Sequence, residues 1–144
     1  MIAVDTNVLV YAHRREAAEH TAARELLRGL AEGGDSWAIP WPCLYEFFSV
    51  VTNPRIWRQS ASMSVQAWAQ IEAWVGSPSV RLLAETPDFA AVLGRFVKLP
   101  RVRGPVVHDA RVAALCVAHG VDVLLTRDRD CSSFRGLRTR DPFA

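Results

Sequence analysis

The sequence predicts an α/β domain in three layers, with helices on both faces of a central, mostly parallel sheet. Short apolar runs alternate with amphipathic helical patterns along the chain, and this alternation is typical of parallel α/β folds. The run Val123–Leu125 is apolar throughout, which suits a strand buried on both faces. With 144 residues, of which half are apolar and 22% are charged, the chain fits one globular domain over residues 1–144.

The first half of the chain is expected to begin with a short strand and then alternate. Apolar residues recur at helical spacing between positions 17 and 30, and proline is favoured in the first turn of a helix but not inside one. In chain order we expect a strand at Ile2–Val4, a helical pattern after Thr6-Asn7, a helix at Ala17–Leu30, a strand at Trp37–Ile39, and a helix that begins at Pro42 and ends before Pro54.

The second half repeats the alternation and has one especially well-bounded helix. Pro105 suits the first helical position and Gly120 suits the residue after the last turn. In chain order we expect helices at Ser64–Val75, Pro87–Val97 and Pro105–His119, and strands at Val80–Leu83 and Val123–Leu125.

Cysteine content and hydropathy exclude several classes of protein. The three cysteines, Cys43, Cys116 and Cys131, are odd in number and form no CxxC pair, which disfavours a disulfide framework or a structural zinc site. No apolar run approaches the roughly 20 residues that a membrane span needs. The opening MIAVDTN lacks the basic region of a signal peptide. We therefore expect a cytoplasmic protein with no membrane partner.

Basic residues are unevenly distributed along the chain. The net charge is +2, and residues 101–144 hold eight Arg and five Asp, a local net of +3. Sixteen of the seventeen basic residues are Arg, whose forked guanidinium group can bond two phosphate oxygens at once. A phosphate-bearing partner is one interpretation, and a compositional bias of the source genome is the other.

Five carboxylates fall where an α/β fold would bring them together. Asp5, Asp128 and Asp130 follow predicted strands, while Glu46 and Asp109 lie near the starts of predicted helices. In a parallel sheet these two kinds of end share one edge, where binding sites form. Clustered carboxylates repel one another, and a helix dipole offsets only about 0.3–1 kcal/mol. A divalent cation would suffice, and oxygen ligands favour Mg²⁺ or Mn²⁺. Such clusters serve phosphoester hydrolysis.

Taken singly, each of these acids has an ordinary structural interpretation as a helix cap, a turn residue or a surface charge. Together, four segments resemble the PIN-domain nucleases, and in order, spacing and chain length they resemble the VapC toxins of bacterial toxin–antitoxin pairs. The segments are Asp5-Thr6-Asn7 after an apolar strand, Glu46 in a mid-chain helix, HDARVAA at 108–114, and TRDRD at 126–130. The resemblance covers essentially the whole chain. One departure is Cys131, where family members often carry Phe, and we interpret it as a change in packing.

The resemblance implies a Mg²⁺- or Mn²⁺-dependent endoribonuclease that forms a homodimer and is silenced by a VapB-type antitoxin. The antitoxin tail would lie across the active-site groove. The implied catalytic acids are Asp5, Glu46, Asp109 and Asp128. Of these, Asp5, Asp109 and Asp128 would bind metal, Asp128 directly or through water. Supporting residues would be Thr6, Asn7, Thr126 and Asp130. Phosphates of the RNA would meet Arg127, Arg129, Arg101 and Arg103.

The hypothetical reaction is in-line attack of an activated water on the scissile phosphorus, which leaves 5′-phosphate and 3′-hydroxyl ends. The main alternative is a non-catalytic PIN-fold module that binds RNA or protein. A response-regulator-like phosphoacceptor is disfavoured because Lys98 does not follow a strand. A haloacid-dehalogenase-like phosphatase is disfavoured because Asn7 stands where DxD needs its second Asp. The sequence leaves open whether tRNA, rRNA or mRNA is cut, and which antitoxin binds.

Overall fold

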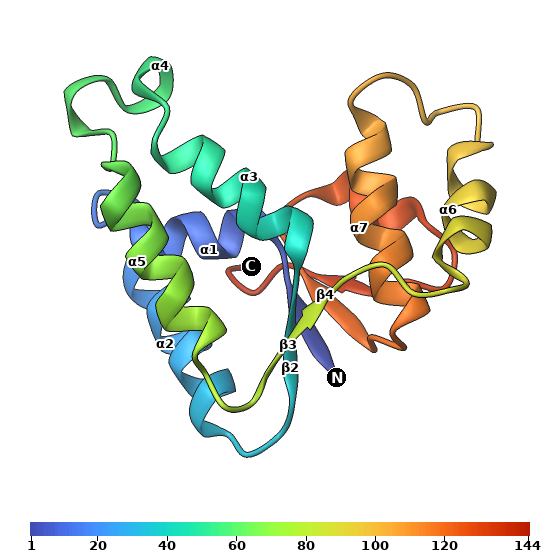
Figure 1. Ribbon diagram of the computed structural model, residues 1–144, viewed down its shortest axis with the longest axis horizontal. Helices are drawn as coiled ribbons and strands as arrows, with labels where there is room; N and C mark the ends of the chain where they lie inside the picture. The colour runs from blue at the N-terminus through green and yellow to red at the C-terminus, as the bar shows by residue number, and fades with distance from the viewer.

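The computed structural model describes residues 1–144 and contains one five-stranded sheet between two groups of helices (Figure 1). Every neighbouring pair of strands is parallel. In spatial order the strands are β3 (Val80–Leu83), β2 (Trp37–Pro40), β1 (Ile2–Val4), β4 (Val123–Leu125) and β5 (Thr139–Arg140). The first strand of the chain therefore lies at the centre of the sheet, between β2 and β4. The predicted α/β class and parallel sheet are confirmed.

Seven α-helices and two short 3₁₀-helices connect the strands. Figure 1 shows α1, α2 and α5 on one side of the sheet and α6 and α7 on the other, which gives the three layers. The helices are α1 (Thr6–His13), α2 (His20–Glu32), α3 (Trp41–Val51), α4 (Pro54–Trp57), α5 (Ser64–Val75), α6 (Phe89–Val97) and α7 (Val106–Ala118), with η1 (Arg58–Ser60) and η2 (Arg129–Ser133).

A single cluster of 32 buried residues forms the core. All four residues of β2 are buried, as are two of the three in β1 and in β4. Trp37, Phe47 and Phe134 are the largest fully buried side chains, and each contributes about 1.5–3 kcal/mol or more by leaving water. None of the helices combines the length and apolar character needed to cross a bilayer.

The predicted bounds of β1, α5, β3 and β4 are confirmed, and those of the other predicted elements differ by one to three residues. The helix expected from Ala17 begins at His20, because Ala17 is held in a turn by its N–H bond to the carbonyl of Arg14. The helix expected from Pro42 begins at Trp41. Pro105 caps α7 rather than occupying its first helical position. Gly120 follows α7 at a φ of +68°, as a residue after a helix C-terminus often does.

Two short elements, α4 and β5, were not predicted. Helix α4 holds only four residues, which are nucleated by Pro54 and by the Asn53 side chain accepting a bond from the backbone of Arg55. Strand β5 is a two-residue edge strand whose register is fixed by Leu124 and Leu125 of β4. Neither is long enough to show a periodic apolar pattern, so sequence periodicity could not detect them.

Candidate active site

Asp5 is positioned by the end of β1 and the start of α1. Val4 is in register with Leu125, and the Asp5 N–H donates to the Leu125 carbonyl at 3.0 Å. The Asp5 side chain caps α1 by accepting a bond from the Thr6 N–H at 2.8 Å. The parallel pairing thus carries Asp5 and the residues after β4 to the same edge of the sheet, as the sequence predicted.

The Thr126 hydroxyl connects two segments at this edge, residues 5–7 and residues 126–128. It donates to Asp5 Oδ2 at 2.7 Å and accepts bonds from Asn7 Nδ2 at 3.1 Å and from the Asp128 N–H at 2.9 Å. Asn7 in turn accepts a bond from the Arg127 N–H at 3.2 Å. Thr126 is only 3% exposed. One buried hydroxyl therefore fixes the carboxylate of Asp5 relative to the backbone that presents Asp128.

Glu46 and Asp109 reach the same place from α3 and α7. The Thr6 hydroxyl donates to Glu46 Oε2 at 2.9 Å, and Asp109 lies in the first turn of α7. A cavity of about 260 Å³ is lined by both of these acids and by Asp5 and Asp128. His108, Cys131 and apolar side chains of α1, α3 and α7 also line it. The four predicted catalytic carboxylates, Asp5, Glu46, Asp109 and Asp128, therefore share one pocket.

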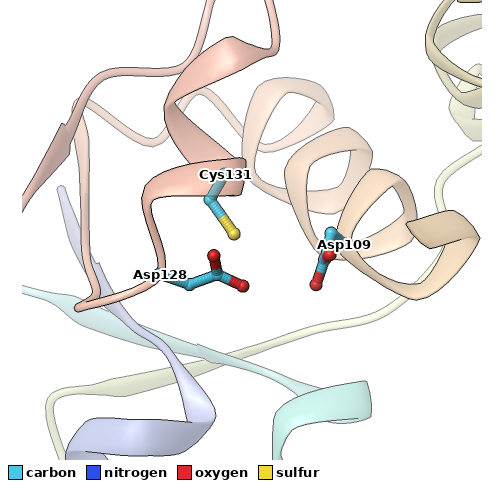
Figure 2. Close-up of side chains that lie close together, drawn as sticks. All are labelled: Asp109, Asp128 and Cys131. Carbon is cyan, nitrogen blue, oxygen red and sulfur yellow. The ribbon is translucent and has the colours of Figure 1, made fainter. Parts of the chain in front are cut away.

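The tightest grouping in this pocket is formed by Asp109, Asp128 and Cys131. One ligand-type atom from each lies within 4.8 Å of the others, and Figure 2 shows the two carboxylates facing each other with the sulfur directed toward them. Partial burial, followed by the nearby charges of Asp128, Asp5 and Glu46, raises the pKa of Asp109 to about 6. The site therefore concentrates negative charge that either a proton on Asp109 or a bound cation would relieve.

The donor set fits a hard divalent cation. The carboxylates of Asp109 and Asp128 are close enough together to share one ion, and two more carboxylates line the same cavity. Carboxylate oxygens are the ligands that Mg²⁺ and Mn²⁺ prefer. Burial and then the charge of Asp5 raise the pKa of the Cys131 thiol well above the usual range. In the metal-free site the Cys131 thiol is therefore protonated, and the two carboxylates are the hard oxygen donors of the group.

Comparison with known proteins identifies the family. The PIN domain family matches residues 2–137. The chain is a PIN domain. It is 33% identical to Ribonuclease VapC48 of Mycobacterium tuberculosis over 97% of this chain and 96% of that protein, so it belongs among the VapC proteins. Two solved structures share the fold: the M. tuberculosis toxin VapC20, described as cleaving the sarcin–ricin loop (TM-score 0.68, 21% identity, 96% and 99% coverage), and VapBC2 of Rickettsia felis bound to promoter DNA (TM-score 0.69, 16% identity, 97% and 98% coverage).

Within this PIN domain, Asp5 sits deeper than the other acids. It is 8% exposed. Its two oxygens accept the bonds from Thr6 and Thr126 and also longer ones, at 3.5 Å, from Asn7 Nδ2 and from the Cys43 thiol. Sequence reasoning missed Cys43, although it stands one helical turn before Glu46, a spacing that places both on the same side of α3.

The arginines expected to bind RNA lie around the PIN domain in different settings. Arg127 forms ion pairs with Glu19 and Asp141. Arg101 donates to the Ser133 carbonyl and lies over the Phe134 ring, and Arg103 donates to the Pro100 carbonyl. Arg129 and Asp130 are exposed beside the acidic pocket. Their predicted roles stay predictions, and Arg127 would have to leave two carboxylates to meet a phosphate.

Proposed function

We propose that this chain, as one PIN domain over residues 1–144, is a metal-dependent endoribonuclease and the toxin of a VapBC-type pair. The observation that carries the proposal is the convergence of four carboxylates in one cavity, with the pKa of Asp109 raised to about 6. The chain is 33% identical to a protein named Ribonuclease VapC48, and this relationship supports the same activity. The filled acidic site disfavours the alternative of a non-catalytic binding module.

In this proposal Asp109 and Asp128 would hold Mg²⁺ or Mn²⁺ directly. One ligand-type oxygen of each lies within 4.8 Å of the other, so that one ion could contact both. Asp5 completes the ligand set from the floor of the pocket, where the Thr126 hydroxyl and the Thr6 N–H fix its orientation. The ion supplies activation of water and neutralisation of the charge that develops on the phosphate.

Glu46 is assigned a separate role because it is exposed at the mouth of the cavity. The Thr6 hydroxyl donates to one of its carboxylate oxygens and leaves the other free to accept a bond from the attacking water. Glu46 thereby orients that water and takes its proton. Water attacks the phosphorus in line and the bond to the 3′ oxygen breaks. The 3′ oxygen takes a proton from solvent, so the products carry 5′-phosphate and 3′-hydroxyl ends.

The proposed partners are a VapB-type antitoxin and a second copy of the chain. The R. felis neighbour was solved as a VapBC complex, which supports an antitoxin partner. Large apolar side chains are exposed on α3, α5 and the segment between them, namely Tyr45, Ile56, Met63, Val65 and Trp68, and a homodimer would cover such a surface. The three free, buried cysteines suit the reducing cytosol.

The test is cleavage of total bacterial RNA by protein freed from antitoxin, with Mg²⁺, with Mn²⁺ and with EDTA, followed by mapping of the cut ends. We expect discrete cuts with 5′-phosphate ends that disappear in EDTA. Cuts that persist in EDTA, or that carry a 2′,3′-cyclic phosphate, would contradict the metal-dependent hydrolysis. Absence of any cut by folded, antitoxin-free protein would favour the binding-module alternative.

A further inference from the structure

A second and larger cavity lies at the opposite end of α1 from the acidic pocket. It has a volume of about 870 Å³ and is enclosed by the turn after α1, by α2 and by α5. Glu16 is the only carboxylate that lines it. The basic side chains around it are Arg14, Arg15, His20, Arg24 and Arg28. We call this feature the basic cavity.

One wall of the basic cavity is held rigidly by Arg14, which is only 5% exposed. Its guanidinium group donates to the Ser60 carbonyl at 2.8 Å and to the Ser60 hydroxyl at 3.0 Å, forms an ion pair with Glu16, and stacks 3.9 Å from the Trp57 ring centre. Its Nε has no partner. Arg14 thus ties the segment at 57–60 to the end of α1 and gives the cavity a fixed shape.

Hydrogen bonds from His13 join the same wall to α5. One ring nitrogen lies 2.8 Å from the Ser62 hydroxyl and the other lies 3.4 Å from the Gln70 side-chain oxygen. Both partners line the cavity. The polar groups of this wall are therefore already positioned in the free protein.

The rim carries three arginines that form no ion pair. Arg15, Arg24 and Arg28 are exposed, and none of them lies within ion-pair distance of a carboxylate. Arg24 and Arg28 stand four residues apart on α2, where like charges slightly destabilise a helix. This placement of like charges therefore does not stabilise the folded, unbound protein, and it suits an anionic ligand.

We propose that the basic cavity binds the phosphate backbone of the RNA substrate a few nucleotides from the scissile bond. The inference rests on the proposed ribonuclease function. Helix α1 has eight residues and so spans about 12 Å, a distance that a few nucleotides of single-stranded RNA can cross. Guanidinium forks match phosphate oxygens, and the three rim arginines supply affinity without reading sequence.

The test is RNA binding in EDTA, where no cleavage is expected, using a labelled single-stranded RNA that spans both ends of α1. The variant is R15Q/R24Q/R28Q. Its matched control is R81Q/R95Q/R138Q, which removes the same charge from exposed positions on β3, on α6 and before β5. We expect the variant to lose affinity about tenfold or more relative to the control. Its salt dependence should weaken by a slope of about 2, since each phosphate contact contributes about 0.7.

Two further arms make the outcome specific. An RNA too short to extend past the acidic pocket should bind the variant and the control equally, and thermal unfolding should show both to be folded. Equal affinity and equal salt slope of variant and control on the long RNA would overturn the proposal. Loss of a co-expressed antitoxin by the variant, with RNA binding like that of the control, would also overturn it and make the cavity a protein-docking site.

Failure of this inference can be told apart from failure of the proposed function. If the wild-type protein cuts RNA in Mg²⁺ or Mn²⁺ and the variant cuts the same long RNA equally well, only the role of the basic cavity is wrong. If the wild-type protein cuts no RNA, the proposed function is wrong, and the binding measurement in EDTA still reports on the cavity.

Discussion

The two ends of α1 carry opposite charge, and each end is fixed by a buried ionisable residue. Asp5 caps the first turn and is 8% exposed, while Arg14 caps the last and is 5% exposed. Each lies at the end of the helix dipole that favours its charge. Their neighbours differ. Beside Asp5 lie further acids, close enough to raise the pKa of Asp109, whereas beside Arg14 lie arginines that extend into solvent.

The difference separates two ways of preparing a charged site. At the acidic end, partly buried like charges oppose one another in a small cavity, so binding a cation relieves an existing cost. At the basic end, the like charges are exposed and screened by solvent, so they cost the fold little and remain available for phosphates. We expect substitutions at the acidic end to change chemistry, and substitutions at the basic rim to change affinity and its dependence on salt.

The largest expected effect is on cleavage by Asp109→Asn. Loss of a ligand that positions the cation removes several kcal/mol of charge stabilisation, which corresponds to a rate loss of at least about 100-fold. Asp35→Asn, in an exposed loop, is the matched control and should cleave at the wild-type rate. A cleavage assay with both variants measures this directly, and an unchanged rate for Asp109→Asn would remove it from the ligand set.

A smaller effect, measured on stability, is expected for Arg14→Met at the basic end. The substitution removes the hydrogen bonds to Ser60 and the stacking on Trp57, which together should cost about 2–3 kcal/mol. Arg15→Met is the control and should stay within about 0.5 kcal/mol of wild type, because Arg15 is exposed and unpaired. Chemical denaturation of the two variants checks this, and equal stabilities would show that Arg14 does not hold the wall.

Thr126→Val should weaken the acidic end without removing a charge. Valine has the shape of threonine, but it leaves Asp5 Oδ2 and the Asp128 N–H without their shared partner. We expect a loss of about tenfold in metal affinity or activity and a destabilisation of about 1–2 kcal/mol. Thr86→Val, whose hydroxyl bonds to the exposed Asp88, should change neither. Activity is titrated against Mn²⁺. Weaker metal binding is overcome at high Mn²⁺, whereas a smaller fraction of folded protein lowers the activity at every Mn²⁺ concentration.

The smallest expected effect is a pH-dependent change in the stability of the metal-free protein. The pKa of Asp109 is about 6 in the folded state against 3.8 as a reference, so folding favours its protonated form. The stabilisation that this raised pKa contributes to the folded state is fully present below about pH 4 and is lost as the pH rises through 6. In EDTA, Asp109→Asn should therefore be more stable than wild type at pH 7.5, by about 1–2 kcal/mol after allowing for solvent screening.

That stability difference should shrink as the pH falls toward 4. Thermal unfolding in EDTA between pH 4 and 8 measures it. Adding Mg²⁺ at pH 7.5 should raise the melting temperature of wild type more than that of the variant. A pH-independent difference would show that Asp109 does not carry the opposing charge at this end of α1.

The convergence of the four acids in one cavity could be predicted from the sequence because these residues lie at element ends. Asp5 and Asp128 follow strands, and Glu46 and Asp109 lie near the starts of helices, so the parallel topology alone brings them to one edge. The Thr126 hydroxyl network depends on side-chain rotamers and could be expected only from the family resemblance. Cys43 was missed because its contact with Asp5 is decided by how α3 packs on α1, the helix that Asp5 caps.

The basic cavity could not be predicted from the sequence. It is formed by the turn after α1, one face of α2, part of α5 and the segment at 57–62. The distances between these parts are set by tertiary packing, and the short helix α4 that shapes the segment has no periodic pattern. The expected RNA-binding arginines were instead chosen for their nearness in sequence to the acids, and one of them, Arg127, is held by Glu19 and Asp141.

The central place of β1 in the sheet bears on when activity can arise during synthesis. Asp5 is synthesised well before the hydroxyl that orients it, which belongs to Thr126, 121 positions later. Strand β1 likewise pairs with β4 only after residues 123–125 have emerged. Because contacts so distant in sequence form late, a nascent or prematurely terminated chain has no assembled acidic pocket. A protein able to cut RNA would therefore become active only after β4 and Thr126 have been synthesised.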